Sequence, residues 1–302
     1  MIEKILGLPS RIRINYETVT KFKKKFRNYI VVYLLYIRNS FPIKAILHSG
    51  EIVVIESQAH LTANLLGIKF LSYDKSTDFT ELETNGFKIK LVGLQYGGDL
   101  GVFMGEYNVY VKDKVVLDIG ANIGDSAIYF INSGASKVIA VEADPFTFDL
   151  LETNVELNGL ANMIIPVNAA VSEKSGILKI PYRRSSTIGT GANSFRYPEG
   201  SAGVEVMKIT LESLIEKYQI NSGVLKIDCE GCEYDAVFGT DGNQIVNAFD
   251  EIILEYHYGA EKIKSILDEL CYITEVTPEK KYYNKSSIPH IMHIGMIHAK
   301  RR

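Results

Sequence analysis

From Lys114 onward, short apolar runs alternate with longer segments whose apolar positions recur every three or four residues. Short runs rich in β-branched residues are typical of strands, and a period of 3.6 residues is typical of helices. The five runs are Val115–Ile119, Lys137–Val141, Ile164–Val167, Val224–Ile227 and Glu251–Leu254. Nearly all their residues are apolar, as expected of parallel strands covered by helices on both faces. The pattern therefore predicts repeated βαβ units and a parallel sheet.

The helices between these runs carry capping signals. Asp144 precedes Pro145 and predicts a helix that ends at Asn158–Gly159. Its inward face is expected to consist of Phe146, Leu150, Leu151 and Val155. Thr210 is the expected cap of the next helix, which carries Leu211, Leu214 and Ile215. A last helix places Ile263, Ile266, Leu267 and Leu270 on one stripe.

Two further runs, Cys271–Thr274 and Ile291–Ile297, follow the last helix. No helix-length segment separates them, so they are predicted to pair antiparallel. The sequence thus predicts a Rossmann-like α/β fold, with a mostly parallel seven-stranded sheet and a final antiparallel strand.

The first 95 residues are patterned differently. We expect a smaller N-terminal α+β region at residues 1–95, followed by the main domain at 96–302. Ile43–Leu47 and Glu51–Ile55 flank a turn and predict a hairpin. The segment 21–41 joins basic residues to the apolar run Tyr29–Ile37, which is too short to span a bilayer. Such a helix packs on the protein or rests on a membrane surface. We favour packing and keep weak membrane contact as the alternative.

Charge and cysteine content narrow the function classes. The net charge of −3 argues against nucleic acid as the main partner, so none is expected. The three cysteines, Cys229, Cys232 and Cys271, give no disulfide framework, and the chain does not begin like a signal peptide. We therefore expect a cytoplasmic protein in which Cys229 and Cys232 are small packing residues. An oligomer remains open.

The segment Leu117–Ser126 follows a predicted buried strand and precedes a helix. Gly120 and Gly124 allow the backbone to turn sharply and to approach a ligand closely. Ligands of open α/β sheets bind at this carboxyl edge of the strands. Glu142 ends the next strand, where a carboxylate can accept hydrogen bonds from a ribose diol. The two features together predict an adenosine-containing cofactor.

The chemistry of the turn favours S-adenosylmethionine (SAM) over a dinucleotide. The turn lacks the G-x-G-x-x-G spacing that binds a pyrophosphate, and Asp118 and Asp125 bracket it. Carboxylates suit a ligand with an ammonium, a sulfonium and no phosphate. The predicted cofactor-binding residues are Asp118, Gly120, Ala121, Asn122, Gly124, Asp125, Ser126, Glu142, Ala143, Asp144, Asn168 and Ala169. If these glycines and Asp118 only form a turn and cap a helix, no cofactor follows.

Ionisable residues mark the ends of the last two parallel strands. Lys226 and Asp228 alternate onto one side of their strand, and Glu255 and His257 onto one side of the next. With Glu230, the carboxylates and the imidazole are expected to converge beside the transferred methyl group. Lys226 is costly to bury unless paired, and an ion pair with Asp228 or Glu233 is the alternative to a catalytic role.

Methyl transfer needs alignment of donor and acceptor and gains from a base that takes the acceptor's proton. His257 is the first candidate because imidazole titrates nearest neutrality, and Asp228 and Glu230 follow. A histidine satisfied in the core is the alternative. Carboxylates with one imidazole can bind Mg²⁺ or Mn²⁺, but nothing in the spacing requires a metal and none is expected. Cys229 and Cys232 lack the second pair that a structural zinc site needs.

Several segments together resemble the FkbM family of SAM-dependent methyltransferases. They are Gly98–Phe103, Glu106–Tyr107, Val116–Asp125, Val138–Pro145, Leu150–Asn154, Leu157–Gly159, Leu225–Tyr234 and Ile253–His257. The resemblance covers about Gly98 to Tyr258, and its most specific part is the K-I-D-x-E-G-x-E pattern at 226–233. Cys229 and Cys232 stand where the family usually has small apolar residues.

The resemblance implies a class I methyltransferase fold, SAM as cofactor and O-methylation of a hydroxyl, commonly on a sugar, polyketide or glycolipid. A small-molecule or glycan acceptor is therefore expected, and the long polar segment 183–203, with its arginines and aromatic residues, is a candidate acceptor-binding loop. A mobile surface loop is the alternative. The competing functions are an inactive SAM-fold binding subunit and an NAD(P)-linked oxidoreductase.

Overall fold

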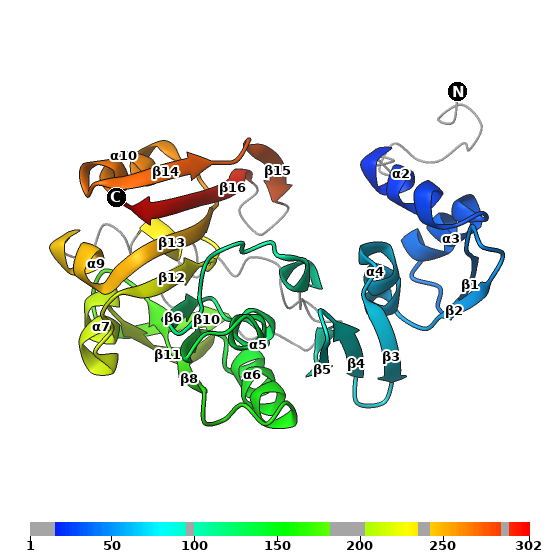
Figure 1. Ribbon diagram of the computed structural model, residues 1–302, viewed down its shortest axis with the longest axis horizontal. Helices are drawn as coiled ribbons and strands as arrows, with labels where there is room; N and C mark the ends of the chain where they lie inside the picture. The colour runs from blue at the N-terminus through cyan, green and yellow to red at the C-terminus, as the bar shows by residue number, and fades with distance from the viewer. Residues whose placement is uncertain (1–15, 95–99, 182–202, 235–241, 285–289) are drawn as a thin grey trace.

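The computed structural model describes residues 16–94, 100–181, 203–234, 242–284 and 290–302 (Figure 1). The strands of its largest sheet are β6 (Val115–Ile119), β7 (Lys137–Glu142), β8 (Ile164–Asn168), β12 (Gly223–Ile227), β13 (Phe249–Tyr256), β14 (Tyr272–Val276), β15 (Lys280–Asn284) and β16 (His290–Arg301). The seven strands on its main path run in the order β14-β16-β13-β12-β6-β7-β8, and β15 pairs with β16 off this path.

Strands β13, β12, β6, β7 and β8 are mutually parallel, and β16 is antiparallel to both β13 and β14. This arrangement confirms the predicted fold class. Each of the five predicted parallel strands is present, and the two closing strands pair antiparallel as expected. The prediction succeeded because these strands are largely buried on both faces and so appear in the sequence as mostly apolar runs.

Helices cover both faces of this sheet. They are η2 (Leu100–Met104), α5 (Asp125–Asn132), α6 (Pro145–Leu157), α7 (Leu211–Tyr218), α9 (Gly242–Ala248) and α10 (Glu261–Glu269). Helices α5 and α6 share a core with Val116 and Val224, whereas α7, α9 and α10 share a core with Leu117 and Leu225. Alternate residues of one strand therefore enter opposite cores, which places Asp118 and Lys226 on the α5 face.

The predicted caps are present, with one error on α6. Asp144 accepts the backbone N–H groups of Phe146 and Thr147, and Thr210 accepts that of Ser213. The expectation that Phe146 packs inward is wrong, because this side chain is 41% exposed. Phe146 lies in the first turn of α6, next to the cap, and its side chain faces solvent.

A small three-stranded sheet lies beside the main one and was not predicted. It comprises β9 (Ala170–Val171), β10 (Gly176–Pro181) and β11 (Gly203–Ile209) in the order β10-β11-β9. Its outer face leaves Ile177 and Met207 more than half exposed, so the sequence carried no clear burial pattern here. Residues 183–202 of the candidate acceptor-binding loop lie outside the described residues.

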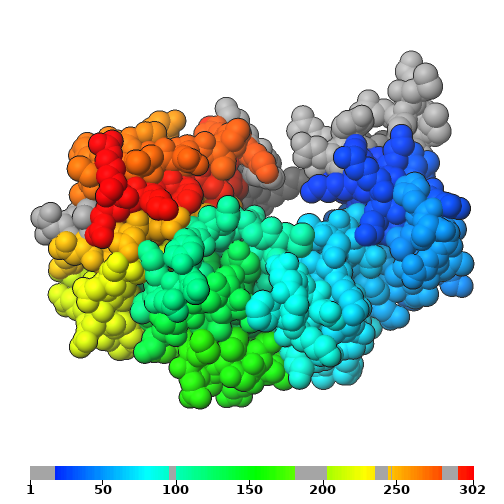
Figure 2. Space-filling view, in the orientation of Figure 1, coloured from blue at the N-terminus to red at the C-terminus, as the bar shows by residue number. Residues whose placement is uncertain are grey.

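The N-terminal part contains two groups of elements: α2 (Tyr16–Lys25), α3 (Tyr29–Ile37), β1 (Ile43–Ile46), β2 (Ile52–Ile55) and α4 (Gln58–Leu66), then β3 (Lys69–Asp74), β4 (Phe79–Thr84) and β5 (Phe87–Val92). The first group forms a lobe at one end of the molecule, blue in Figure 2, with a core of its own around Phe22 and Phe26. The predicted hairpin is β1–β2. The segment 21–41 forms two helices rather than one, and Val32 of α3 is buried.

Strands β3, β4 and β5 form a meander that shares the core of the main domain through Leu82, Ile89 and Leu91. Strands β4 and β5 are joined by the turn at Asn85–Gly86. Asn154 of α6 ties this meander to the cofactor turn: its side chain exchanges hydrogen bonds with both backbone groups of Val92 and donates to the Ile123 carbonyl at 2.8 Å. Among the described residues, no helix is long and apolar enough to cross a membrane.

Candidate active site

The turn after β6 is held against the loop that follows β12. Gly120 has φ +75°, and a Cβ built on it would lie 1.8 Å from the carbonyl oxygen of Asp228. Glycine is therefore required for both conformation and space. The contact brings two segments separated by more than 100 residues together at the carboxyl edge of the sheet. The predicted cofactor turn and the predicted reaction edge are thus adjacent.

Glu142 joins the ends of β6 and β7. Its carboxylate accepts the backbone N–H of Asn122 at 3.0 Å and that of Asp144 at 2.8 Å. The Asn168 side chain donates to the Glu142 carbonyl at 2.9 Å. This hydrogen bond links the end of β8 to the end of β7. Burial raises the pKa of Glu142 to about 7, although the two backbone hydrogen bonds oppose this shift. The two backbone hydrogen bonds fix the carboxylate in position at the carboxyl edge of the sheet.

The predicted cofactor residues divide by exposure. Ala121, Gly124, Asp125, Ser126 and Ala169 are buried, as is Asp118, whereas Gly120, Asn122, Glu142, Ala143, Asp144 and Asn168 are partly exposed. Only the second group has surface available for a ligand. The buried members lie beneath the turn and support it.

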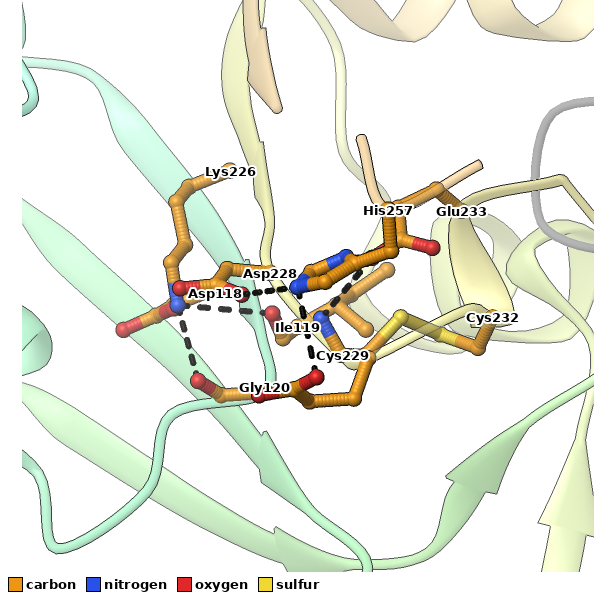
Figure 3. The surroundings of a disulfide bond; sticks show 10 residues. Asp118, Ile119, Gly120, Lys226, Asp228, Cys229, Cys232, Glu233 and His257 are labelled. Carbon is orange, nitrogen blue, oxygen red and sulfur yellow. Dashed lines mark hydrogen bonds and ion pairs between the residues drawn. A yellow bond between two sulfur atoms is a disulfide. The ribbon is translucent and has the colours of Figure 1, made fainter. Parts of the chain in front are cut away.

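Asp118 and Lys226 form a buried ion pair under the turn (Figure 3). Their side chains are 0% and 2% exposed, and Lys226 Nζ lies 2.9 Å from Asp118 Oδ1. The amine also donates to the Gly120 carbonyl at 2.8 Å, and Ser126 Oγ donates to Asp118 Oδ2 at 2.6 Å. The expected partners of Lys226, Asp228 or Glu233, were wrong. Asp118 and Lys226 are register partners on β6 and β12, so their side chains project together.

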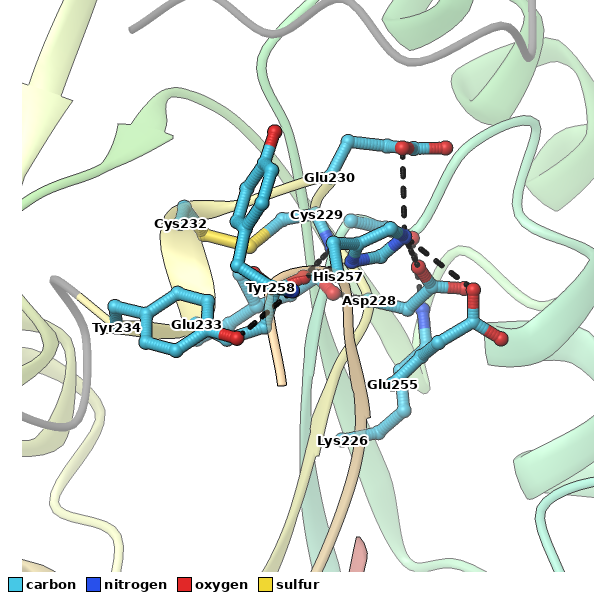
Figure 4. A network of polar contacts seen from close by, with 12 residues as sticks. Lys226, Asp228, Cys229, Glu230, Cys232, Glu233, Tyr234, Glu255, His257 and Tyr258 are labelled. Carbon is cyan, nitrogen blue, oxygen red and sulfur yellow. Dashed lines mark hydrogen bonds and ion pairs between the residues drawn. A yellow bond between two sulfur atoms is a disulfide. The ribbon is translucent and has the colours of Figure 1, made fainter. Parts of the chain in front are cut away.

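His257 lies at the centre of a carboxylate cluster at the ends of β12 and β13 (Figure 4). Its ring is 1% exposed, and Nδ1 lies 2.8 Å from Glu233 Oε1. Nε2 lies 3.3 Å from Glu230 Oε2 and 3.3 Å from Glu255 Oε1. Asp228 Oδ1 is 4.0 Å away. The predicted convergence of Asp228, Glu230, Glu255 and His257 is therefore present.

The surroundings of His257 do not suit a general base. Burial lowers the pKa of the imidazole, but its hydrogen bonds to Glu233 and Glu255 outweigh burial and raise the pKa to about 11. The ring then holds its proton at neutral pH and has none of the capacity that a base needs. This raised pKa weighs against His257, the first candidate for the base, and the role of this residue stays a prediction. Burial raises the pKa of Glu230 to about 7, although His257 opposes the shift.

Two residues of this site were not assigned a role from the sequence. Glu233 is fully buried and holds His257. Tyr107, from the segment after η2, donates its hydroxyl to Asp228 Oδ2 at 2.9 Å, and its ring centroid lies 5.3 Å from Lys226 Nζ. Both lie inside segments of the family resemblance, which was the only signal that could have indicated them. Tyr107 thus connects the ion pair to the reaction edge.

Cys229 and Cys232 form a disulfide beside the cluster, with Cα atoms 5.5 Å apart. The expectation that they are separate packing residues was wrong. The residues between them, Glu230 with φ +59° and Gly231 with φ +122°, turn the chain back sharply enough to bring the two sulfurs together. The backbone N–H of Cys229 also donates to Glu233 Oε1 at 3.4 Å.

One protein family, curated relatives and solved structures are similar to this chain. The methyltransferase FkbM domain matches residues 118–285, more than half of the chain. Protein arginine N-methyltransferase 1 of Oryza sativa subsp. indica is 36% identical over 62 residues, which are 20% of this chain and 16% of that relative. The match thus spans less than a fifth of that protein's length.

Among solved structures, M. jannaschii TYW2 in complex with AdoMet has a TM-score of 0.38 and 16% identity, and covers 77% of this chain and 90% of that one. M. jannaschii tRNA m1G37 methyltransferase has a TM-score of 0.39 and 16% identity, with coverage of 77% and 59%. At 16% identity, these similarities say nothing about the substrate of this chain. The family and its SAM cofactor agree with the sequence-based expectation.

The exclusion of nucleic acid as a partner is corrected. It rested on the net charge of −3, yet the matched structures include a tRNA methyltransferase. Net charge averages over the whole surface and says nothing of the groups at one edge of a sheet. The exclusion is therefore withdrawn.

Proposed function

Because the chain belongs to the FkbM methyltransferase family, we propose that it transfers the methyl group of SAM to a hydroxyl oxygen. The acceptors we propose are hydroxyl-bearing molecules such as a sugar, a glycolipid or a polyketide. The observation that carries the proposal is the contact between Gly120 and Asp228, since it sets the cofactor turn beside partly exposed carboxylates. A methyl donor on the turn and an acceptor at the carboxylates would then meet.

In this proposal Glu142 accepts hydrogen bonds from the ribose hydroxyls. The partly exposed backbone around Gly120 and Asn122 contacts the rest of the cofactor. Asp118, Lys226 and Ser126 act from below as positioning residues, because they are buried and bonded to one another or to the turn. The sulfonium is attracted to an edge that carries Asp228 and Glu255.

The acceptor oxygen forms a bond to the methyl carbon as the carbon–sulfur bond breaks, and S-adenosylhomocysteine leaves as a neutral thioether. Alignment of the two reactants supplies much of the acceleration. The hydroxyl proton passes to a carboxylate, for which we propose Glu230. Its side chain is 34% exposed and within reach of an acceptor, whereas that of His257 is 1% exposed.

Cofactor binding gives a first test. In calorimetry at pH 8, we expect SAM and S-adenosylhomocysteine to bind and NAD not to bind. The pKa of Glu142 is about 7, so protonation below this value removes the acceptor of the ribose hydroxyls. SAM affinity should therefore fall as the pH drops below 7, by at most about tenfold for each pH unit.

The control for this titration is Glu142→Gln, which keeps the shape of the side chain and removes its ionisation. We expect weaker SAM binding in this variant and a flatter pH dependence than in the wild type. An identical pH dependence in both proteins would contradict the role of Glu142. Transfer of a labelled methyl group to a hydroxyl tests the proposal as a whole, and label recovered on nitrogen would contradict it.

A further inference from the structure

We propose that the reaction edge binds one divalent cation, Mg²⁺ or Mn²⁺, through His257 Nε2 and the carboxylates of Asp228 and Glu255. The cation site stands on the geometry of these side chains. Its role, to bind the acceptor's hydroxyl oxygen, rests on the proposed function.

The spacing of the donor atoms fits a cation. Nε2 lies 3.3 Å from Glu255 Oε1 and 4.0 Å from Asp228 Oδ1. Ligand atoms at ~2.1 Å from an octahedral cation are separated by ~3.0 Å along each edge. A small closing movement of Asp228 would bring its Oδ1 as near to Nε2 as Glu255 Oε1 already lies. Oxygen ligands with a single imidazole favour Mg²⁺ or Mn²⁺.

The far side of the imidazole is arranged as in metal-binding histidines. Nδ1 is held by Glu233 Oε1 at 2.8 Å, and Glu233 is fully buried. A carboxylate on Nδ1 fixes the ring and directs Nε2 at the ligand. Here it directs Nε2 at the carboxylates of Asp228, Glu230 and Glu255. A cation would replace the proton on Nε2, since a ligating imidazole must be neutral.

A second observation is independent of the acidic residues on the open side. Glu233 Oε2 is buried and has no hydrogen-bond partner among the described residues. Possible ligand atoms of Asp228, Glu233 and His257 also lie within 4.8 Å of one another, so Glu233 is a further carboxylate within reach of the proposed cation beside Glu255. Four carboxylates thus surround one imidazole, and the nearby Lys226 is paired with Asp118. Glu233 and His257 are the buried members, and further positive charge beside them would offset the cost of burying the Glu233 carboxylate.

In the reaction, the cation would orient the acceptor oxygen and weaken its bond to hydrogen. Glu230, which faces Nε2 at 3.3 Å and is the most exposed of these carboxylates, remains to take the proton. The acceptor class this favours is a molecule with a hydroxyl and a neighbouring oxygen, because two oxygens can bind the cation together.

The test uses the full chain, stripped with EDTA and titrated with Mn²⁺ by calorimetry in the absence of SAM. We expect one Mn²⁺ per chain. Glu255→Gln removes the charge of a ligand, and Glu233→Gln removes the charge of the group that orients His257, so each should weaken Mn²⁺ binding by about 10–100-fold. Absence of binding to the wild type up to about 1 mM Mn²⁺, a weak affinity for such ions, would overturn the proposal.

The matched control is Glu279→Gln. Glu279 also pairs with a histidine, His293, at 2.7 Å, and its side chain is 32% exposed compared with 27% for Glu255. Binding should be unchanged in this variant, and equal losses in Glu255→Gln and Glu279→Gln would overturn the assignment. Circular dichroism confirms that each variant is folded. Methyl transfer that persists in EDTA would remove the cation's role alone, whereas Mn²⁺ binding without any methyl transfer would contradict the proposed function alone.

Discussion

Replacing Lys226 by methionine should lower the free energy of unfolding by about 3–5 kcal/mol, because it leaves the Asp118 carboxylate buried without its cation. Both side chains are almost completely buried, and the amine also donates to the Gly120 carbonyl. Burial lowers the pKa of Lys226, but Asp118 and Asp228 outweigh it and the net pKa is raised, so the amine is charged. Chemical denaturation followed by circular dichroism measures the change.

Two controls separate this effect from loss of packing. The double variant Lys226→Met/Asp118→Asn removes both charges of the pair and should be more stable than Lys226→Met alone. Lys69→Met breaks a pair with Glu83 in which the side chains are 66% and 36% exposed. Exposed pairs contribute about 0–1 kcal/mol, so this variant should change little. Equal costs for Lys69→Met and Lys226→Met would contradict the buried-pair account.

Replacing Glu230 by glutamine is expected to reduce turnover by about 10²–10⁴-fold, the usual contribution of a general base. The amide keeps the size of the side chain but cannot accept the hydroxyl proton. SAM affinity should remain within about twofold of the wild type, because Glu142 and not Glu230 contacts the cofactor turn. Single-turnover rates at saturating SAM measure the effect.

Glu230→Asp serves as the companion variant, since it keeps a carboxylate and displaces it by one methylene. Its rate should lie between those of the wild type and Glu230→Gln. If Glu230→Gln kept more than about a tenth of the wild-type rate, the proton would have another acceptor and the assignment of the base would be wrong.

The parts of the fold that could be predicted are those with local signals. Strands β6, β7 and β12 are apolar on both faces, and the caps at Asp144 and Thr210 lie next to their helices in sequence. The sheet β9–β11 was missed because β11 is only partly buried and β9 spans only Ala170–Val171. Burial on both faces leaves a clear pattern, whereas a sheet at the surface does not.

The candidate site could be predicted as a set of residues but not as a set of partners. Asp228, Glu230, Glu255 and His257 end neighbouring strands, so their convergence followed from topology. The pairing of Lys226 with Asp118 depends on the register between β12 and β6, which no local pattern encodes. The bond from Tyr107 to Asp228 joins residues 121 positions apart. The raised pKa of His257 likewise depends on a hydrogen bond to Glu233, which lies 24 positions away in the sequence.

The most direct test of the central claim is the fate of the methyl group. SAM with a deuterated methyl group is incubated with the protein and with separate pools of hydroxyl-bearing molecules, RNA and peptides, and the products are analysed by mass spectrometry and NMR. We predict a methyl ether on a hydroxyl oxygen, formed by the wild type and reduced in Glu142→Gln and Glu230→Gln. Methyl transfer only to a nitrogen of RNA or peptide would contradict the account.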